Sequence, residues 1–381
     1  MNTRRILAAA ALCVLAAEAA GEFHFTVTAD MRSYHSSFDA VAQSINNDVG
    51  GPGAFHVSPG DIDGTIADNR AVIDARFGPS AVWYPLVGNH ETETAADMTW
   101  VRDEYNSGNG ARTPLKTYTN QDGPAGAVET TFSWDYGNAH FISLNEYYNG
   151  VSDVGTDGDV VPALYDWLAA DLAANQRPFV FVFGHEPAYP ENRHVGDSLD
   201  KYPARRDAFW ALLEAQGVQA YFCGHTHYYS KHRNAGGTVW QFDAGNAGNG
   251  AIDDGLTYLD VVVGPTEARV NVYRDKPTGT FALADSVTVL GLVVPGDANG
   301  DGAVDVGDLG ILGAHYGQSG VTWAEGDFTA EGNVDVGDLG VLGAHYGAGA
   351  GGSPVPEPAS VLVLAVLATA VGRSRRRAPR G

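Results

Sequence analysis

The chain has 381 residues, which is more than one ordinary domain and favours a main body with appended modules. Hydrophobic residues make up 44% of it and aromatic residues 10%, which suffices for a large packed core and excludes global disorder. The 46 acidic residues outnumber the 23 basic ones, and a formal net charge of −23 would repel nucleic acid and anionic lipid. A nucleic-acid-binding module is therefore not expected.

Residues 1–20 have the three parts of a secretory signal peptide. Arg4 and Arg5 are followed by an apolar run over residues 6–17 and by small residues over 17–20. We expect the mature chain to begin near Gly21. Because Cys13 lies inside this segment, Cys223 has no partner cysteine in the mature chain, and no internal disulfide can form.

Residues 21–290 alternate apolar runs with amphipathic stretches, which predicts a mixed α/β domain in which helices cover a sheet. The predicted strands are residues 23–29, 54–58, 82–87, 140–144, 179–183 and 219–223. The predicted helices are residues 38–46, 66–77, 95–105, 162–174 and 204–216. Short β runs follow one another from 239 to 289, and the polar segment 107–127 is expected to be an exposed loop.

Polar side chains of metal-binding type follow these strands at the points where they end. They are Asp30, Asp61, Asn89, His90, His185, His225 and His227. Glycine precedes four of these groups, at positions 60, 88, 184 and 224, where it would let the backbone turn tightly. Because ligands of open α/β sheets collect at the carboxyl ends of strands, we expect these side chains to converge on one site.

This set of donors indicates a particular chemistry. A bridging carboxylate, further oxygen ligands and several imidazoles suit a pair of Fe, Mn or Zn ions. Two such ions roughly 3.5 to 4 Å apart share a hydroxide, direct it at phosphorus and stabilise charge on the phosphoryl oxygens. The sequence therefore predicts phosphoester hydrolysis without a protein nucleophile, with His90 as proton donor or transition-state stabiliser. His194 and His232, in the loops that follow, would line the mouth of the site.

In their order and spacing, the Gly88-Asn-His-Glu91 and Gly224-His-Thr-His227 blocks resemble the calcineurin-like metallophosphoesterase superfamily, which includes purple acid phosphatases. The resemblance covers about residues 23–265. It implies a four-layer αββα sandwich and a catalytic role for His90. The ligand set that it implies is Asp61 bridging both metals, Asp30 and His227 on the first metal, and Asn89, His185 and His225 on the second.

The chain departs from the family pattern at its first motif. Most members read Asp-x-His there, whereas Arg32 takes the position of that histidine, and Gly64 stands where purple acid phosphatases have a tyrosine. The first metal site is thus short of ligands and would need His35 or a water to complete it. Alternatively, Arg32 contacts the substrate phosphate through its guanidinium group, or forms an ordinary ion pair.

After a linker over residues 291–296, a segment rich in glycine and aspartate occurs twice. Oxygen ligands at positions 1, 3, 5, 7 and 12 of a loop, with glycine at position 6, are typical of EF-hand-type calcium loops. The ligand positions are Asp297, Asn299, Asp301, Ala303 and Asp308 in the first copy, and Asp327, Thr329, Glu331, Asn333 and Asp338 in the second. The sequence therefore predicts two Ca²⁺ ions, with weaker binding in the second copy, where Thr329 and Glu331 replace asparagine and aspartate.

Over residues 297–348 the paired loops, each followed by one short helix, resemble type I dockerin modules. The resemblance implies a small all-α module that gains much of its folding energy from calcium. It also implies a cohesin-like partner in a polysaccharide-degrading assembly. The tail that follows suggests another role for the module, as a calcium-stabilised spacer at the cell surface.

A second linker, residues 349–358, leads to the C-terminal tail. Residues 359–381 contain an apolar run of about a dozen residues, too short for a free-standing membrane span, and end in an arginine cluster. With Pro356-Glu357-Pro358 before them, they resemble the PEP-CTERM sorting signal of exported bacterial proteins; a single-pass anchor is the alternative. We expect the protein outside a bacterial cell or on its surface, in contact with the membrane only through this tail.

Two functions are compatible with these features. The first is exported, metal-dependent hydrolysis of phosphomonoesters or phosphodiesters. The second is that of a degenerate domain, which has lost its first metal and serves as a surface-displayed binding or assembly module. Arg32 keeps the second open, whereas the intact blocks at 88–91 and 224–227 favour the first, because a pure binding protein has no need of all of them.

Overall fold

The computed structural model describes residues 22–62, 66–110, 112–248, 255–291, 294–329 and 331–348. The predicted signal peptide, the predicted sorting tail and Gly64 lie outside these ranges. Within the described part of the chain, no helix has the length and apolar character needed to cross a bilayer.

Two β-sheets form the centre of the molecule. The six-stranded sheet is ordered β13 (Ala282–Leu290), β12 (Glu267–Arg274), β11 (Thr257–Val263), β1 (Phe23–Val27), β2 (His56–Ser58) and β3 (Trp83–Pro85). The seven-stranded sheet is ordered β4 (Thr119–Asp122), β5 (Phe132–Tyr136), β6 (Ala139–Ser143), β7 (Phe179–Phe183), β8 (Ala220–Cys223), β10 (Trp240–Ala244) and β9 (Tyr229–His232). Strands β1, β2 and β3 run parallel, as do β6, β7 and β8, so each sheet has a parallel centre.

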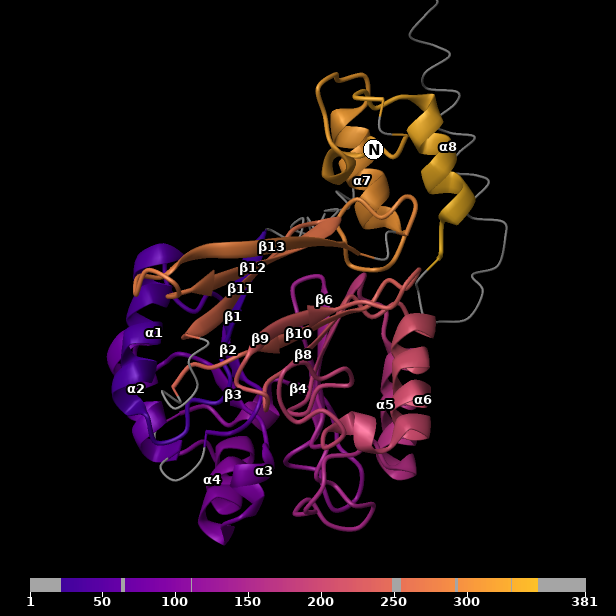
Figure 1. Cartoon of the computed structure of the whole chain (residues 1–381). Coiled ribbons are helices and arrows are strands. Elements are labelled where there is room, and N and C mark those ends of the chain that lie inside the picture. Colours follow the sequence, from indigo (N-terminus) through magenta and orange to yellow (C-terminus); the bar gives the residue numbers. More distant parts are fainter. Residues whose placement is uncertain are drawn as a thin grey trace, which may run out of the picture.

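Helices cover the outer face of each sheet (Figure 1). On the first sheet they are α1 (His35–Asp48), α2 (Ile66–Phe77) and α4 (Ala95–Asn106), and on the second α5 (Pro162–Ala174) and α6 (Pro203–Ala215). Short elements lie between them: α3 (Asn89–Thr92), the 3-10 turns η1 (Leu115–Thr117) and η2 (Leu199–Lys201). The layers thus run helix, sheet, sheet, helix, which confirms the predicted mixed α/β architecture.

The two faces of strand β7 show how the sequence builds these layers. Phe179, Phe181 and Phe183 point into the core between the sheets, whereas Val180 and Val182 point into the core beneath the helices. Alternate side chains of a strand face opposite sides, so a strand buried on both sides reads as a continuous apolar run. This is why β7 could be predicted from the sequence.

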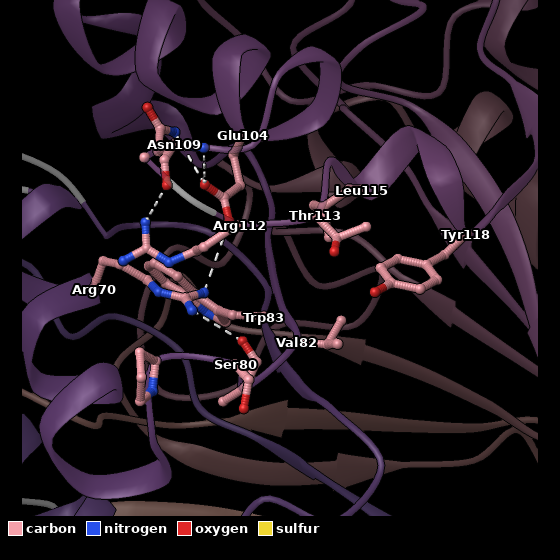
Figure 2. Close-up of a pocket in the computed structure, with 13 residues that line it drawn as sticks. Arg70, Ser80, Val82, Trp83, Glu104, Asn109, Arg112, Thr113, Leu115 and Tyr118 are labelled. Carbon is pink, nitrogen blue, oxygen red and sulfur yellow. Dashed lines mark hydrogen bonds and ion pairs between the residues drawn. The ribbon is translucent and has the colours of Figure 1, made fainter.

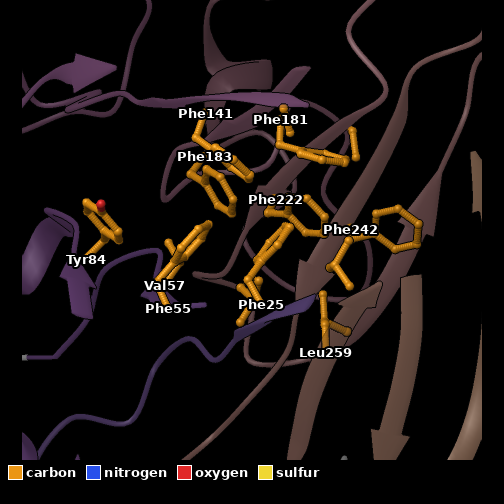
Figure 3. Close-up of a cluster of buried hydrophobic side chains, with 14 of the residues drawn as sticks. Phe25, Phe55, Val57, Tyr84, Phe141, Phe181, Phe183, Phe222, Phe242 and Leu259 are labelled. Atoms are coloured by element: carbon orange, nitrogen blue, oxygen red, sulfur yellow. The ribbon is translucent and has the colours of Figure 1, made fainter. Parts of the chain in front are cut away.

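The core between the sheets is dominated by aromatic side chains (Figure 3). Phe25 of the first sheet lies among rings of the second, with centroid distances of 5.3 Å to Phe141 and 5.6 Å to Phe181. Both contacts are edge-to-face, the arrangement that the ring quadrupole favours. These contacts hold the two sheets in a fixed relation, and the site described below lies across both.

The segment 107–127 differs from the expected exposed loop. It contains the turn η1 and the edge strand β4, which pairs with β5. Strand β4 consists of Thr119, Asn120, Gln121 and Asp122, which alternate between half-buried and exposed. Because all four are polar, the strand lacks the apolar alternation by which strands are predicted.

Two loop–helix units form the C-terminal repeats; the first loop begins at Asp297 and the second at Asp327, and the structure describes residues 294–329 and 331–348 of this region. Their helices are α7 (Val306–His315) and α8 (Val336–His345), and a 3-10 turn, η3 (Trp323–Glu325), lies between them. A small core that includes Val304, Leu312 and Leu342 joins the two units. Figure 1 shows the repeats at one end of the sheets. The first loop touches the main domain there, where a Cβ on Gly302 would lie 1.5 Å from the carbonyl oxygen of Gln176.

Candidate metal centre

The predicted ligands converge where the carboxyl ends of the parallel strands meet. Asp30 and Asp61 follow β1 and β2, and His185 and His225 follow β7 and β8. Ligand atoms of Asp30, Asp61 and His185 all lie within 4.8 Å of one another, and the three side chains are buried. Both sheets therefore contribute to one cluster.

His185 lies at the centre of the residues predicted to hold the second metal. Its Nε2 atom is 3.2 Å from Asp61 Oδ1, 3.2 Å from Asn89 Oδ1 and 3.2 Å from His225 Nδ1. Its Nδ1 atom lies 2.8 Å from the carbonyl oxygen of Pro59, which can only accept a hydrogen bond. The proton is therefore on Nδ1, and Nε2 presents a lone pair to the cluster.

Asp30 and His227, predicted for the first metal, belong to the same cluster. His227 Nε2 lies 3.6 Å from Asp30 Oδ1, and the Asp30 carboxylate accepts a hydrogen bond from the backbone N–H of His225 at 3.0 Å. His35, the alternative ligand, instead has its Nδ1 atom 3.1 Å from Asn69 Oδ1. Its Nδ1 atom is therefore directed at Asn69, and a ligand role for His35 stays a prediction.

His90 and Arg32 lie side by side at the edge of the cluster. His90 Nε2 is 3.7 Å from Asp61 Oδ2, and its Nδ1 atom is 3.2 Å from Glu93 Oε2. Arg32 Nη2 is 3.3 Å from His90 Nδ1. Arg32, which takes the position where most family members have a histidine, thus lies at the edge of the cluster.

The electrostatics of the cluster fit a cationic occupant. Burial and the nearby carboxylates of Asp61 and Asp243 raise the pKa of Asp30 well above its usual range. Burial lowers the pKa of His185, and it lowers that of His227 to about 3, so both imidazoles are neutral, as metal ligands need to be. Crowded buried carboxylates beside neutral imidazoles form a donor set that metal ions would neutralise and join.

The backbone at the cluster adopts a conformation that is unusual for residues with side chains. The φ angles of Asp30, Arg32, Asp61, His225 and His227 are 57°, 44°, 54°, 73° and 61°. Each such left-handed residue costs on the order of 1–3 kcal/mol, and such residues concentrate at functional sites. The strain aims these side chains at a common point.

The glycines at positions 60, 88, 184 and 224 are expected to let the backbone turn tightly, but most of them have another role. Of the four, only Gly60 has a left-handed φ, of 87°. A Cβ on Gly88 would lie 2.5 Å from the Asp61 amide nitrogen, and one on Gly224 would lie 2.6 Å from Asp30 Oδ2. These two glycines therefore allow close approach of the ligand side chains and loops, while the ligands themselves make the turns.

A model of the calcineurin-like phosphoesterase family matches residues 23–229. The chain belongs to this family. Purple acid phosphatase 18 of Arabidopsis thaliana is 30% identical over 188 residues, which cover 47% of this chain and 38% of that protein. An acid phosphatase of Aspergillus ficuum is 29% identical over 137 residues, which cover 26% of this chain and 21% of that protein. The chain thus spans well under half the length of these curated relatives.

Solved structures resemble this phosphoesterase chain at low sequence identity. A structure of PhoD has a TM-score of 0.49 and 12% identity, and covers 70% of this chain and 69% of its own. GAP50, described as the anchor in the inner membrane complex of Plasmodium, has a TM-score of 0.48 and 13% identity, and covers 71% of this chain and 89% of its own.

Glu91 supports the phosphoesterase site in a way that the sequence does not reveal. Its carboxylate accepts hydrogen bonds from the backbone N–H groups of Asp61, Ile62 and Gly88, at 2.9, 2.7 and 2.6 Å. It therefore ties the loop after β2 to the loop after β3. The motif contains Glu91, but nothing in its spacing predicts which amides it binds.

The loop after β7 brings two further residues to the phosphoesterase site. The ring of His194 lies 4.0 Å from that of His225, centroid to centroid, as expected for the mouth of the site. Arg193 is adjacent, and its Nη1 atom is buried without a hydrogen-bond partner in the described part of the chain. His232 does not reach the site, because it stacks on Tyr189 at 4.1 Å.

The residues predicted to bind calcium in the first repeat lie together. Asp308 is fully buried, and its Oδ1 atom accepts a hydrogen bond from the backbone N–H of Asn299 at 3.2 Å. Asn299 Nδ2 donates to Asp301 Oδ2 at 2.9 Å, and the backbone N–H of Ala303 donates to Asp301 Oδ1 at 2.9 Å. Burial raises the pKa of Asp297 to about 6.

The second repeat has a similar arrangement with a more open side. Thr329 Oγ1 lies 3.0 Å from Asp338 Oδ1 and 3.5 Å from Asp327 Oδ1. Glu331, which is exposed, and Asp338 belong to a group of carboxylates whose ligand atoms lie within 4.8 Å. Asn333 forms an isolated β-bridge at the end of this loop.

A cavity of about 410 Å³ lies away from the predicted metal ligands, at the N-terminal end of β3 (Figure 2). Arg70, Trp83, Glu104 and Arg112 line it. Arg70 Nη1 lies 3.7 Å from Glu104, and Arg112 Nη2 donates to Asp74 at 2.5 Å, so acidic groups compensate both arginines. None of the predicted catalytic or metal-binding residues lines this cavity.

Proposed function

We propose that the protein is an exported, metal-dependent phosphoesterase that hydrolyses phosphomonoesters or phosphodiesters. The observation that carries this proposal is the convergence of Asp30, Asp61 and His185, from both sheets, within 4.8 Å in a chain of the calcineurin-like phosphoesterase family. The acid phosphatases among its relatives support the same reaction class.

Two ions of Fe, Mn or Zn would lower the pKa of a water and neutralise the phosphoryl oxygens. We assign Asp61 to both ions, following the family pattern. The remaining assignments are Asp30 and His227 to the first ion, and Asn89, His185 and His225 to the second.

His90 is assigned to protonate the leaving-group oxygen. Its Nε2 atom faces the cluster 3.7 Å from Asp61 Oδ2, and its Nδ1 atom lies 3.2 Å from the Glu93 carboxylate. Arg32 and Glu93 both lie on the Nδ1 side of the ring, so a proton on Nε2 is directed at the site, where it can be transferred. The ring is partly exposed, so it can be reprotonated from solvent after each turnover.

Arg32 is assigned to the substrate phosphate. Its left-handed φ of 44° and its Nη2 atom 3.3 Å from His90 place the guanidinium beside the ring that would serve the leaving group. A guanidinium pairs with two phosphate oxygens at once. An Arg32→Ala protein with unchanged kcat and KM would contradict this assignment.

We further propose that the C-terminal repeats bind two calcium ions and act as a dockerin-like module, either for a cohesin-like partner or as a spacer at the cell surface. The oxygen-rich loops described above support this. Calorimetric titration should find two calcium sites, the weaker one in the second repeat, and Asp308→Ala should remove one site and Asp338→Ala the other. Titrations in which neither variant loses a site would contradict the proposal.

The main test measures metal content by elemental analysis, together with hydrolysis of p-nitrophenyl phosphate and bis-p-nitrophenyl phosphate before and after addition of Mn, Fe or Zn. Two transition metals per chain, with kcat lowered by roughly 10²- to 10⁴-fold in His90→Ala, would support the enzyme. His232→Ala is the matched control, because that ring lies outside the cluster. At most one metal and no turnover would favour the other function, a surface-displayed binding module.

A further inference from the structure

Arg193 has no role in the assignments made so far, although it belongs to the loop that covers the site. The ring of its neighbour His194 packs against that of His225, with a centroid distance of 4.0 Å. The residues on both sides of it, Asn192 and His194, have left-handed φ angles of 65° and 57°. Such a backbone is strained, and strain of this kind is kept where a side chain must point in a set direction.

The Arg193 guanidinium is incompletely satisfied. Its Nη1 atom is buried and has no hydrogen-bond partner among the described residues. A buried charged donor without an acceptor costs free energy, so buried donors of this kind are normally paired with protein, solvent or a ligand. The positive charge also lies close enough to the cluster to lower the pKa of Asp30 and of His227, each after larger contributions that include burial.

An acceptor that enters the site can satisfy this donor, and an acceptor with negative charge forms the stronger hydrogen bond with a guanidinium group. Arg32 lies beside His90, and Arg193 precedes His194, whose ring lies 4.0 Å from that of His225, so the two arginines come to the cluster from different segments. A phosphoryl group has non-bridging oxygens that can accept from both.

We propose that Arg193 donates a hydrogen bond from Nη1 to a non-bridging oxygen of the substrate phosphoryl group, and so favours terminal phosphates over diesters. This inference rests on the proposed phosphoesterase function. A phosphomonoester dianion has three non-bridging oxygens, so oxygens remain for both guanidinium groups when the metal ions also take part, whereas a diester has only two and a smaller charge. Arg193 is thus a substrate-contacting residue that determines specificity.

The test compares the wild-type protein with Arg193→Met and Arg193→Lys, using p-nitrophenyl phosphate, bis-p-nitrophenyl phosphate and calorimetric binding of inorganic phosphate. We expect Arg193→Met to lower kcat/KM for the monoester, and the affinity for phosphate, by about 10- to 100-fold, the usual worth of a hydrogen bond to a charged group. Diester hydrolysis and metal content should change little. Arg193→Lys should recover part of the loss, because it restores the charge but not the planar donor group.

Arg233→Met is the matched control. Arg233 is an exposed arginine that lies over the Trp240 ring, with its guanidinium carbon 4.6 Å from the ring centroid, and it should leave every measurement unchanged. Equal losses for both substrates, or a lower metal content in Arg193→Met, would show that Arg193 only supports the ligands and would overturn the inference. If the wild-type protein hydrolyses neither substrate, the proposed function fails, and phosphate binding alone decides the role of Arg193.

Discussion

Replacing Gly302 with alanine tests whether the first C-terminal repeat packs on the phosphoesterase domain in solution. Gly302 has a φ of 84°, and a Cβ there would lie 1.5 Å from the carbonyl oxygen of Gln176 in the main domain. Gly332 is its counterpart in the second repeat, with a φ of 81° and nothing within 4 Å of an added Cβ. The two substitutions share the backbone strain and differ in the clash.

The expected difference follows from these distances. Alanine in the left-handed region costs about 1–2 kcal/mol, and this applies to both variants. At Gly302 the added Cβ would also have to move by roughly 2 Å to reach an ordinary contact of 3.4 Å. Because the atom in its way belongs to the backbone of Gln176, no rotamer change relieves the clash, and the loop must separate from the domain. The second cost, of about 1–3 kcal/mol for an overpacked contact, falls on Gly302→Ala alone.

Urea unfolding followed by tryptophan fluorescence, in calcium-containing buffer, gives the free energy of unfolding of each variant. Hydrogen exchange of residues 297–308 reports the interface directly. Gly302→Ala should destabilise the protein by more than Gly332→Ala and should raise exchange in this segment. Equal destabilisation, within about 0.5 kcal/mol, with unchanged exchange would refute the packing of the first repeat on the domain.

Three other results are expected. Glu91→Gln keeps the shape of the side chain but removes the negative charge that accepts hydrogen bonds from three backbone amides. Metal content by elemental analysis should therefore fall, while the melting temperature changes little. Full metal content would contradict the role of Glu91. Burial alone would lower the pKa of His140, but hydrogen bonds to Asp135 and Asp171 raise it from 6.5 to about 9. This stabilisation, on the order of 3 kcal/mol, is fully present below pH 6.5 and is lost as the pH rises through 9. His140→Gln should therefore flatten the decline of unfolding free energy across that range, and an unchanged slope would disprove the pairing. Phe25→Ala should cost about 3–5 kcal/mol in urea titrations, because the cavity lies between both sheets, and a loss below 1 kcal/mol would argue against that packing.

The parts of the fold and site that could be predicted are those that depend on local pattern. Asp30, Asp61 and His185 each come one to three residues after a run rich in apolar residues. A buried parallel strand has such a run, and it ends in the loop that forms the site. The position of these side chains within 4.8 Å of one another agrees with that reasoning. Their roles as metal ligands stay a prediction.

The remaining parts depend on contacts between distant segments. Strand β1 pairs in antiparallel fashion with β11, with Phe25 opposite Val261, and no local pattern selects that partner. The contact between His194 and His225 comes from an irregular loop whose left-handed residues carry no periodic signal. The unpaired atom of Arg193 becomes visible only once that loop is folded.

The strained backbone of the site is held by the aromatic core that lies next to it. Left-handed residues such as His225 persist only if the surrounding structure holds them, since each would relax at a gain of on the order of 1–3 kcal/mol. Phe183 and Phe222, which lie just before the loops that carry His185 and His225, stack with ring centroids 5.1 Å apart. This stack fixes the ends of β7 and β8 relative to each other, and with them the two imidazoles. A variant that loosens the stack should therefore weaken metal binding before it unfolds the domain, so the core between the sheets takes part in function as well as in stability.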